Sequence, residues 1–230
     1  MKNLTNEKPQ DQLYGRPKWI IESIDLEDFQ DKDILNIGCG FGWFEYNMAP
    51  FVKSIIGVEP DEKGLQTAKR NINIENVDFQ IGDALKLPFE DSVFDTVVSW
   101  EVIEHIPKNT EKLMINEISR VLKSGGVFYL STPYKSFRSC VFDPAWLLTG
   151  HRHYSFKKMR EIIENSGVMY IVKMLSRGGF ISIMNVINLY ISKWIFRRPP
   201  FLKDYFSNLE NDEWKKNSGY ATLYVKAVKK

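Results

Sequence analysis

The sequence predicts a doubly wound α/β domain, in which seven strands form a mostly parallel sheet with helices on both faces. Short apolar runs alternate along the chain with stretches of helical periodicity, and this order is typical of βαβ units. The first run ends in a glycine-rich loop that leads directly into a helical stretch. The 230 residues, of which 43% are hydrophobic and 26% charged, suffice for a large core and exclude a disordered or fibrous chain.

Each predicted strand is a run of apolar and β-branched residues. The strands are expected at 33–37, 54–59, 77–81, 94–100, 127–131, 168–175 and 220–228. Apolar residues at helical spacing predict helices at 17–24, 43–51, 62–72, 110–123, 156–165 and 180–196. Gly125 is expected to end the fourth of these helices as its C-cap, and Ser155 to begin the fifth as its N-cap.

The composition limits the class of protein. Lys and Arg together number 31 and Asp and Glu 29, which excludes a strongly basic nucleic-acid packager. The charge is unevenly divided, because residues 1–115 hold 12 basic and 21 acidic residues and residues 116–230 hold 19 and 8. Two cysteines cannot form a disulfide framework, and no apolar stretch follows Lys2, so we expect a cytoplasmic chain without a signal peptide.

Three glycines, Gly38, Gly40 and Gly42, lie between the first strand and the helix that follows it. Glycines there let the backbone approach a ligand closely, and the helix N-terminus offers unpaired N–H groups. The dinucleotide-binding fingerprint requires its third glycine at position 43, where this chain has Trp43. A nicotinamide oxidoreductase is therefore disfavoured.

Two carboxylates stand at the ends of the next two strands. Glu59 ends the second strand, where a carboxylate can accept two hydrogen bonds from a ribose diol. Asp83 follows the third strand, where a carboxylate can accept a hydrogen bond from an adenine amino group. Strand ends are often acidic for other reasons, so neither residue identifies the ligand alone.

Five motifs occur in order between Ile34 and Pro133: ILNIGCGFG, GVEPDEKGLQTAKRN, GDALKLPF, FDTVVSWEVIEHI and VLKSGGVFYLSTP. In this combination the chain resembles the class I S-adenosylmethionine-dependent methyltransferases. The resemblance implies a Rossmann-like sheet with an insertion before the last strand, S-adenosylmethionine as methyl donor and S-adenosylhomocysteine as product. We expect one domain, made of an N-terminal arm and helix (1–30), a cofactor-binding core (31–134), an acceptor-side loop, helix and strand (135–177), an apolar insertion or lid (178–217) and the last strand (218–230).

The resemblance also implies which residues contact the cofactor. They are Gly38, Cys39, Gly40 and Gly42 at the methionine moiety, Glu59 and Pro60 at the ribose, Asp83 and Ala84 at the adenine, and Trp100 and Glu101 beside the sulfonium. One position departs from the family pattern, because Asn36 stands where the family has Asp or Glu. Asn36 keeps an acceptor but lacks the negative charge, so we expect cofactor binding to be weaker by about 1 kcal/mol.

Glu104 and His105 end a short cluster, Glu101-Val102-Ile103-Glu104-His105. The E-x-x-E-H pattern resembles the metal site of ubiquinone-pathway O-methyltransferases and of small-RNA 2′-O-methyltransferases. There, two carboxylates and an imidazole hold a divalent ion that polarises the acceptor hydroxyl. Three interpretations remain open: a metal site, His105 as the proton acceptor, and simple packing.

A second cluster follows the fifth strand, at the edge where open parallel sheets place their substrate crevice. It comprises residues 143–146 and the sequence His151-Arg152-His153-Tyr154-Ser155. His151 is predicted as a further candidate for general-base catalysis, together with Glu104 and His105. Tyr154 has two interpretations, since it either lines the acceptor site or packs against the helix that follows.

Residues 178–200 form an apolar insertion in which Ser182, Asn185, Asn188 and Ser192 make one narrow polar stripe on a helix. The segment is too short and too polar to span a membrane. Three interpretations remain open: a lid over the substrate crevice, a packing or dimer helix, and a helix at a membrane interface. Cations that would assist the last are Lys173, Arg177, Lys193, Arg197 and Arg198.

Together these features predict methyl transfer from S-adenosylmethionine to a small-molecule or lipid-like acceptor, at oxygen because of the Glu-His cluster. A nucleic-acid methyltransferase is the first alternative, but the basic residues are interleaved with apolar runs rather than gathered with aromatic residues into a groove. A non-catalytic scaffold that keeps the fold is the second. The basic second half, which holds the acceptor side, favours an acidic or membrane-associated acceptor.

Overall fold

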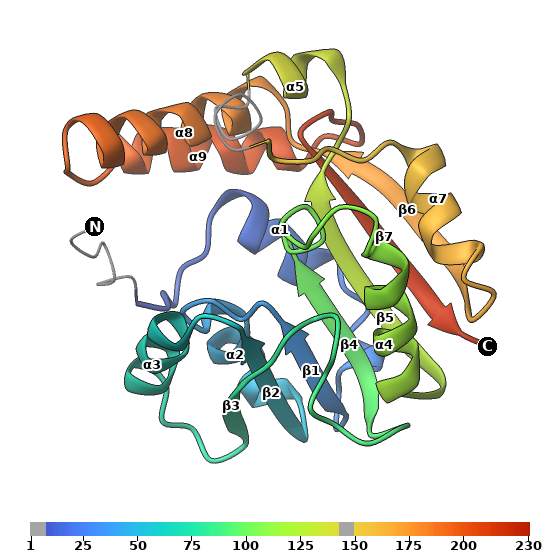
Figure 1. The fold of residues 1–230 in the computed structure, drawn as a ribbon. Helices are drawn as coiled ribbons and strands as arrows, with labels where there is room; N and C mark the ends of the chain where they lie inside the picture. Colours follow the sequence, from blue (N-terminus) through green and yellow to red (C-terminus); the bar gives the residue numbers. More distant parts are fainter. Residues whose placement is uncertain (1–7, 143–149) are drawn as a thin grey trace.

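The computed structural model describes residues 8–142 and 150–230, in which a seven-stranded sheet is covered by helices on both faces (Figure 1). Its strands are β1 (Asp33–Ile37), β2 (Ser54–Glu59), β3 (Val77–Ile81), β4 (Phe94–Trp100), β5 (Leu122–Pro133), β6 (Met169–Arg177) and β7 (Thr222–Lys229). Strands β1 to β5 pair in parallel, whereas β7 runs antiparallel to both β5 and β6. The predicted mostly parallel α/β sheet of seven strands is confirmed.

The strand order β3-β2-β1-β4-β5-β7-β6 places a switch point between β1 and β4. From β1 the chain first builds outward through β2 and β3, and then returns to add β4 and β5 on the other side. In open α/β sheets the loops that follow two such strands diverge and leave a crevice at the carboxyl ends of the strands. Ligands of open α/β sheets bind at such a crevice.

Two layers of helices cover the sheet. On one face, α4 (Glu111–Val121) and α7 (Phe156–Glu164) bury Met114, Ile118 and Ile163 against strand residues such as Leu35 and Val97. On the other face, α1 (Gly15–Ser23) and α2 (Trp43–Met48) pack against the sheet, with α3 (Glu62–Asn71) beside β2 and β3. The alternation of strand and helix in the sequence thus becomes a core on each side of the sheet.

Before the insertion, the helix boundaries follow the predictions with one correction. Ser155 does cap α7, because its hydroxyl accepts a hydrogen bond from the Lys158 N–H at 3.2 Å. Gly125 does not cap α4, which ends at Val121, four residues earlier. Leu122 already pairs with Phe94 at the start of β5, and this sheet pairing ends the helix.

The insertion is a pair of helices rather than the single predicted helix. The first is α8 (Phe180–Tyr190), which continues into a π-helical turn, η3 (Ile191–Ile195), and the second is α9 (Lys203–Trp214). The two helices lie side by side above the sheet (Figure 1). The short helix α5 (Phe137–Phe142), which contacts α8, was likewise not predicted.

Buried Glu213 of α9 joins the two helices of the insertion. Its carboxylate accepts hydrogen bonds from the backbone N–H groups of Gly179, Ile181 and Ser182 at 2.8 to 2.9 Å, and from the Ser182 hydroxyl at 2.8 Å. These are the unpaired N–H groups of the first turn of α8, so Glu213 caps this helix from its neighbour. The two helices are therefore held together at this end.

The polar stripe of α8 faces inward. Asn185 donates to Glu210 at 2.6 Å, and Asn188 donates to the carbonyl of Phe201 at 2.7 Å. Ser182 and Ser192 are buried on the same side. The predicted stripe exists, but it packs against α9 and the segment before it instead of facing water.

Within the described residues, no helix is long and apolar enough to cross a bilayer. Residues 143–146 of the predicted acceptor-side cluster, and residues 1–7 of the arm, lie outside the described residues.

Candidate active site

Three glycines with left-handed backbone form the loop between β1 and α2, with φ of +77° at Gly38, +56° at Gly40 and +85° at Gly42. A Cβ atom at Gly38 would lie 2.4 Å from a methyl of Val102, and one at Gly42 would lie 2.4 Å from a methyl of Ile72. At Gly40, a Cβ atom would meet nothing within 4 Å. Close packing therefore requires two of the glycines, while the third borders open space.

The Glu59 carboxylate is turned toward this loop. Its Oε2 accepts a hydrogen bond from the Gly40 N–H at 3.1 Å, and its Oε1 accepts one from the Asp61 N–H at 3.4 Å. Asp61 in turn caps α3 by accepting from the Gly64 N–H at 2.9 Å, and Pro60 is exposed between the two carboxylates. The predicted ribose acceptor thus lies half-buried against the middle glycine of the loop.

Asp83 is exposed in the turn after β3, and buried Ala84 follows it. The Asp83 carboxylate accepts a hydrogen bond from the Leu85 N–H at 2.9 Å, which shapes the turn. Because β3, β2, β1 and β4 are consecutive neighbours, their carboxyl ends bring the predicted cofactor residues to one edge of the sheet. In order along that edge they are Asp83 and Ala84, Glu59 and Pro60, Gly38 to Gly42 with buried Cys39, and Trp100 with Glu101.

Asn36 has a partner that the sequence did not indicate. Its side-chain amide donates a hydrogen bond of 2.7 Å to Oε1 of Glu45 in the first turn of α2, and both residues are buried. The pair fits only because β2 has Gly57 at this level, where a Cβ atom would come within 2.6 Å of Glu45 Oε1. Burial raises the pKa of Glu45 to about 8. A carboxyl group is therefore present beside position 36, but it belongs to Glu45, nine residues later in the sequence than the family pattern has it.

Trp100 ends β4 with its ring in the core rather than in open space. The indole stacks on Tyr224 with ring centroids 6.3 Å apart and packs against Phe44 at 5.5 Å. Its Nε1 is buried and has no hydrogen-bond partner among the described residues. Trp100, which was predicted to lie beside the sulfonium, thus packs chiefly in the core.

Glu101, the next residue, adopts a left-handed backbone with φ of +58°. Its carboxylate accepts a hydrogen bond from the Ser131 hydroxyl at 2.8 Å and pairs with the guanidinium of Arg16 at 2.7 Å. Arg16 lies in α1, whose first N–H donates to Asn211 of α9 at 2.6 Å. The N-terminal helix therefore reaches the end of β4, a contact with no signal in the motifs.

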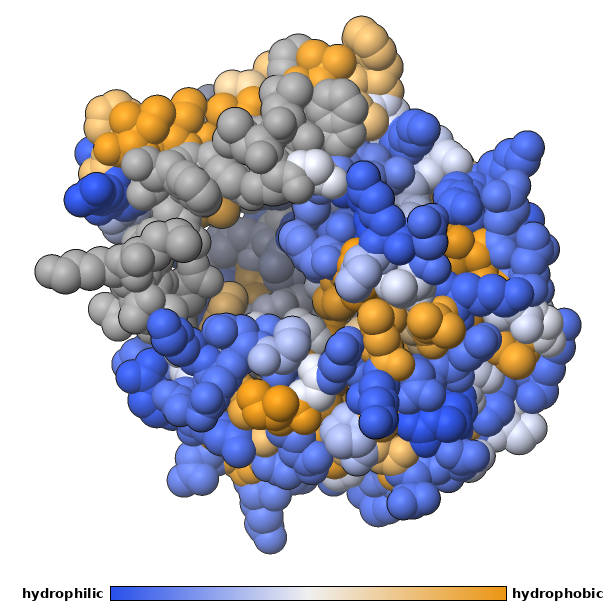
Figure 2. All heavy atoms as spheres, in the orientation of Figure 1, coloured by the Kyte–Doolittle hydropathy of each residue, from blue (hydrophilic) through white to orange (hydrophobic). Residues whose placement is uncertain are grey.

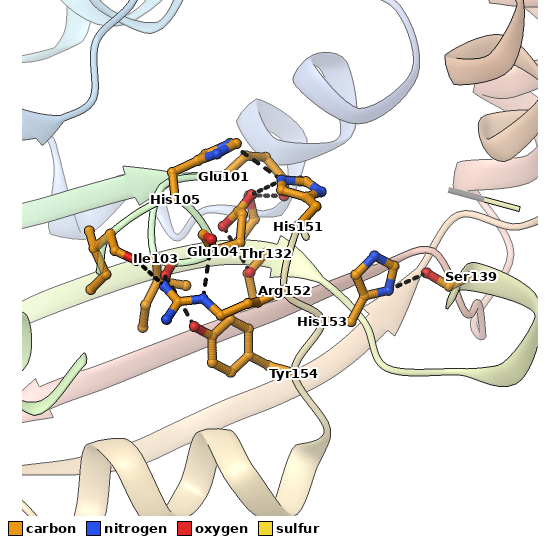
Figure 3. Close-up of polar contacts among 12 residues, drawn as sticks. Glu101, Ile103, Glu104, His105, Thr132, Ser139, His151, Arg152, His153 and Tyr154 are labelled. Atoms are coloured by element: carbon orange, nitrogen blue, oxygen red, sulfur yellow. Dashed lines mark hydrogen bonds and ion pairs between the residues drawn. The ribbon is translucent and has the colours of Figure 1, made fainter. Parts of the chain in front are cut away.

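Glu104 is buried at the base of a cluster of polar side chains (Figure 3). One carboxylate oxygen, Oε2, accepts a hydrogen bond from the Thr132 hydroxyl at 2.9 Å. The other, Oε1, has no hydrogen-bond partner among the described residues and lies 3.8 Å from Nε2 of His151. Burial, and then the charge of Glu101, raise the pKa of Glu104 well above its usual range.

His105 and His151 meet over this carboxyl group, with their Nε2 atoms 3.3 Å apart (Figure 3). Burial and the neighbouring His151 lower the pKa of His105, so its imidazole is neutral at pH 7. One ligand atom from each of Glu104, His105 and His151 falls within 4.8 Å of the others. The structure thus brings all three predicted catalytic residues together, from two loops that are 46 residues apart.

Arg152 sets the distance between these two loops. Its guanidinium donates to the carbonyls of Ile103, Glu104 and Ile106 at 2.5 to 3.2 Å, and it pairs with Glu111 at 2.8 Å. The arginine therefore spans the turn that carries Glu104 and His105, next to His151 in its own loop. Its positioning role was not predicted, because nothing local marks the carbonyls that it binds.

Tyr154 supports the same turn. Its hydroxyl donates to the Ile103 carbonyl at 3.1 Å and lies 3.1 Å from Glu111, and its ring is buried. Burial raises the pKa of this tyrosine. Of the two interpretations, the contacts match packing, against the turn after β4 as well as against the core of α7.

The cluster lines a cavity of about 470 Å³ beside the insertion. Glu104, His105 and His151 form one wall, and Ile183, Val186 and Leu189 of α8 form another. The bonds of α8 to α9 hold this second wall in place. The cavity therefore joins the polar cluster at the carboxyl edge of the sheet to a wall of α8, where these apolar residues lie beside Ser182 and Asn185.

Comparisons with known proteins find a methyltransferase domain in this chain. Residues 35–130 match the methyltransferase domain family. A ubiquinone biosynthesis O-methyltransferase of Pelagibacter ubique is 29% identical over 170 residues, which cover 66% of this chain and 69% of that protein. A fatty-acid O-methyltransferase of Mycolicibacterium smegmatis is 32% identical over 103 residues, which cover 44% of this chain and 37% of that protein. The chain spans about half the length of the curated relatives it matches.

Solved structures share the fold over nearly the whole chain. S-adenosylmethionine-dependent methyltransferases from Mesorhizobium loti and Aquifex aeolicus each superpose with a TM-score of 0.61, at 16% and 13% identity. The superpositions cover 92% and 94% of this chain and 96% and 90% of those proteins. Residues 35–130 therefore form a methyltransferase domain, and nearly the whole chain has the fold that these S-adenosylmethionine-dependent methyltransferases share.

Proposed function

We propose that this chain transfers a methyl group from S-adenosylmethionine to a hydroxyl oxygen of a small-molecule or lipid-like acceptor. The observation that carries the proposal is the meeting of Glu104, His105 and His151 in a cavity directly after β4. A methyl acceptor must stand in line with the donor, and a hydroxyl acceptor also needs a group that takes its proton. Imidazoles at this place supply that group.

The carboxyl edge of the sheet fits the cofactor. When bound, S-adenosylmethionine supplies an electrophilic methyl carbon on a sulfonium whose leaving group is a neutral thioether. Gly40 leaves open space beside the loop, Glu59 would hold the ribose and Asp83 would hold the adenine. Glu101 would place a carboxylate near the positive sulfonium.

His105 is the side chain best suited to take the proton. Because its pKa is lowered, the ring is neutral at pH 7 and has a lone pair to offer. As the acceptor oxygen forms its bond to the methyl carbon, its O–H bond breaks and the proton passes to the imidazole. His151, 3.3 Å away, can hold the ring or take the proton in its place.

The same side chains also fit a divalent ion. The buried Oε1 of Glu104 has no hydrogen-bond partner among the described residues, and two imidazole nitrogens lie close to it. Carboxylate and imidazole donors within such a span suit a transition-metal ion. Glu104, His105 and His151 would hold the ion, which would polarise the acceptor hydroxyl.

The shape of the cavity favours an acceptor with a polar and an apolar part. Its apolar wall of Ile183, Val186 and Leu189 suits a ring or an acyl chain, while the hydroxyl would sit at the histidines. Relatives named as ubiquinone biosynthesis and fatty-acid O-methyltransferases support the choice of oxygen. Such an acceptor would be found at a membrane, and peripheral contact through residues 178–200 is a separate expectation on which the transfer of the methyl group does not depend.

Calorimetry with S-adenosylhomocysteine tests the cofactor part of the proposal. We expect one site per chain, and binding that is lost in Glu59→Ala. Glu75→Ala removes an exposed carboxylate in the loop before β3 and serves as the matched control, with affinity unchanged. No binding to the wild-type chain would overturn the proposal.

A screen for transfer of a tritiated methyl group to lipid, quinol and phenol extracts then tests the acceptor. We expect label in an amphipathic hydroxyl compound, and little label with His105→Asn or His151→Asn. Full turnover after chelation would remove the metal interpretation and leave His105 as the proton acceptor. Label found only in nucleic acid or in amines would overturn the choice of acceptor.

A further inference from the structure

The two helices of the insertion are arranged in the opposite way to an ordinary surface helix. A surface helix turns its apolar face to the core and its polar face to water. In α8 the polar residues Asn185 and Asn188 instead bond inward, to Glu210 of α9 and to the carbonyl of Phe201. The apolar residues are left for the outside of the molecule.

A set of large apolar side chains on two neighbouring elements is exposed as a result, and we call it the α5–α8 surface. Its members are Phe137 and Val141 of α5, Phe180, Val186 and Leu189 of α8, and Ile191, Ile195 and Phe196 after it. Phe137 is 84% exposed, Ile195 69% and Phe196 57%. Figure 2 shows hydrophobic side chains gathered along the top of the molecule, over α8 and α5. Contiguous apolar surface of this kind marks an interaction site.

The charge of this surface is of one sign. Residues 178–200 contain no Asp or Glu, and neither does α5. Arg197 and Arg198 are exposed directly after Phe196, at the end of the surface. Of the other predicted cations, Arg177 is directed elsewhere, since it lies over the ring of Trp19 and donates to backbone carbonyls. Among the described residues, exposed arginines lie at the end of this apolar surface and 178–200 has no acidic residue, which makes the surface complementary to anionic headgroups above acyl chains.

The same surface is continuous with the cavity. Val186 and Leu189 line the cavity and are also 39% and 41% exposed, so they stand at its rim. A molecule that lies among the acyl chains against α8 could thus pass its polar end over this rim, toward His105 and His151. The surface and the cavity wall are two sides of one helix.

We propose that the α5–α8 surface docks on an anionic lipid bilayer, and that the acceptor enters the cavity from the bilayer over the rim at Val186 and Leu189. The entry step rests on the proposed function, whereas the docking does not. A second copy of the chain is the competing occupant, but packing two such surfaces on each other would gather positive charges with no acidic side chain among them.

Vesicle flotation with the full chain tests the docking, without cofactor or acceptor present. Phosphatidylcholine vesicles and vesicles with three parts in ten of phosphatidylglycerol are compared. We expect binding to the anionic vesicles to be at least tenfold stronger and to weaken with salt. Arg197→Gln with Arg198→Gln should lower it by roughly fivefold per arginine, while Lys157→Gln with Lys158→Gln, two exposed cations of α7, should leave it unchanged.

The apolar contribution is tested with Ile195→Gln and Phe196→Gln together, two exposed residues outside the cavity. We expect vesicle binding to fall at least tenfold, with S-adenosylhomocysteine affinity unchanged as a measure of intact fold. Leu113→Gln with Val172→Gln, exposed apolar residues on α4 and β6, is the matched control and should bind as the wild type does.

Two results would overturn the docking. One is an equal loss of vesicle binding in the Ile195/Phe196 variant and in its Leu113/Val172 control, and the other is no vesicle binding by the wild-type chain. Sedimentation velocity identifies the competitor, because a concentration-dependent dimer that Ile195→Gln and Phe196→Gln abolish would assign the surface to a second copy. A chain that binds vesicles but not S-adenosylhomocysteine would contradict the proposed function alone. A chain that binds S-adenosylhomocysteine but not vesicles would contradict the docking alone.

Discussion

The side-chain amide of Asn36 donates a 2.7 Å hydrogen bond to the carboxyl group of Glu45, and neither residue is reached by water. This pair joins β1 to the first turn of α2, on either side of the glycine loop. The remaining oxygen of each side chain has no hydrogen-bond partner among the described residues. A neutral carboxyl group suits such surroundings better than a charged one.

The first prediction concerns stability against pH. The pKa of Glu45 in the folded chain is about 8, while the pKa of a glutamate in an unfolded chain is about 4.3. Between these pH values the folded chain holds a proton that the unfolded chain has released, so the free energy of unfolding falls as the pH rises, by up to about 1.4 kcal/mol per pH unit. Glu45→Gln should remove this slope and be more stable than the wild type at pH 8.5.

Urea unfolding at pH 5.5, 7 and 8.5 measures the slope. Glu75→Gln, which alters an exposed carboxylate, should keep the wild-type dependence. If Glu45→Gln and the wild type lost stability in parallel over this range, Glu45 would be ionised in the folded chain.

The second prediction exchanges the two groups. Asn36→Asp places two carboxyl groups at hydrogen-bond distance in a buried site, and should destabilise the chain by roughly 3 kcal/mol at pH 7. Adding Glu45→Gln restores one donor and one carboxyl group, now at the family's usual position, and should recover most of that loss. The measurement is a double-mutant cycle by urea unfolding, and purely additive effects would contradict the pairing.

The glycine loop and the strands that lead to it could be predicted because their signals are local. A short apolar run followed by Gly38, Gly40 and Gly42 specifies a strand, a turn with positive φ and a helix start within a dozen residues. Glu104 and His105 were found in the same way, as neighbours in one motif.

Features that depend on distant segments could not be predicted. The fit of Glu45 depends on Gly57 in the next strand, and the role of Arg152 depends on carbonyls nearly fifty residues earlier. The helix α9 was missed because its contacts are with distant segments: its Glu213 caps α8, more than thirty residues earlier, and the helix also packs against α1. Pairing with α9 also decides which face of α8 is exposed, and periodicity alone does not contain that information.

The third prediction separates folding from cofactor binding in the glycine loop. Gly40→Ala introduces a side chain at φ of +56° with no atom within 4 Å, so it should cost roughly 1–2 kcal/mol of stability from the backbone alone. Gly125→Ala also has a positive φ, of +73°, and the same open space far from the cofactor edge, and should cost a similar amount. Only Gly40→Ala should weaken S-adenosylhomocysteine binding, by about 1–3 kcal/mol in calorimetry. Equal affinities for the two variants would place the cofactor elsewhere.

The fourth prediction concerns the pH dependence of methyl transfer. His105 must be neutral to take a proton. Because its pKa is lowered, the fall of kcat/KM on the acid side of the pH profile, its acid limb, should lie below pH 6.5. His105→Asn should lower the rate by about 10²-fold or more and abolish this limb. His153→Asn, a histidine of the same cavity that lies 3.0 Å from Ser139 instead, should keep both the rate and the limb. A limb unchanged in His105→Asn would transfer the role to His151.

The last prediction tests Arg152 as a positioning residue. Arg152→Lys keeps the charge but cannot reach the three carbonyls and Glu111 together, so the turn that carries Glu104 and His105 should loosen. We expect a loss of roughly 2–3 kcal/mol in the free energy of unfolding, and a fall in kcat that exceeds any change in KM. S-adenosylhomocysteine affinity should not change, because Arg152 contacts no residue of the cofactor edge in these hydrogen bonds.

Arg160→Lys, in an exposed pair with Glu164, is the matched control and should change stability by less than about 0.5 kcal/mol. If Arg152→Lys lowered stability yet left kcat intact, the arginine would serve the fold and not the geometry of the histidines.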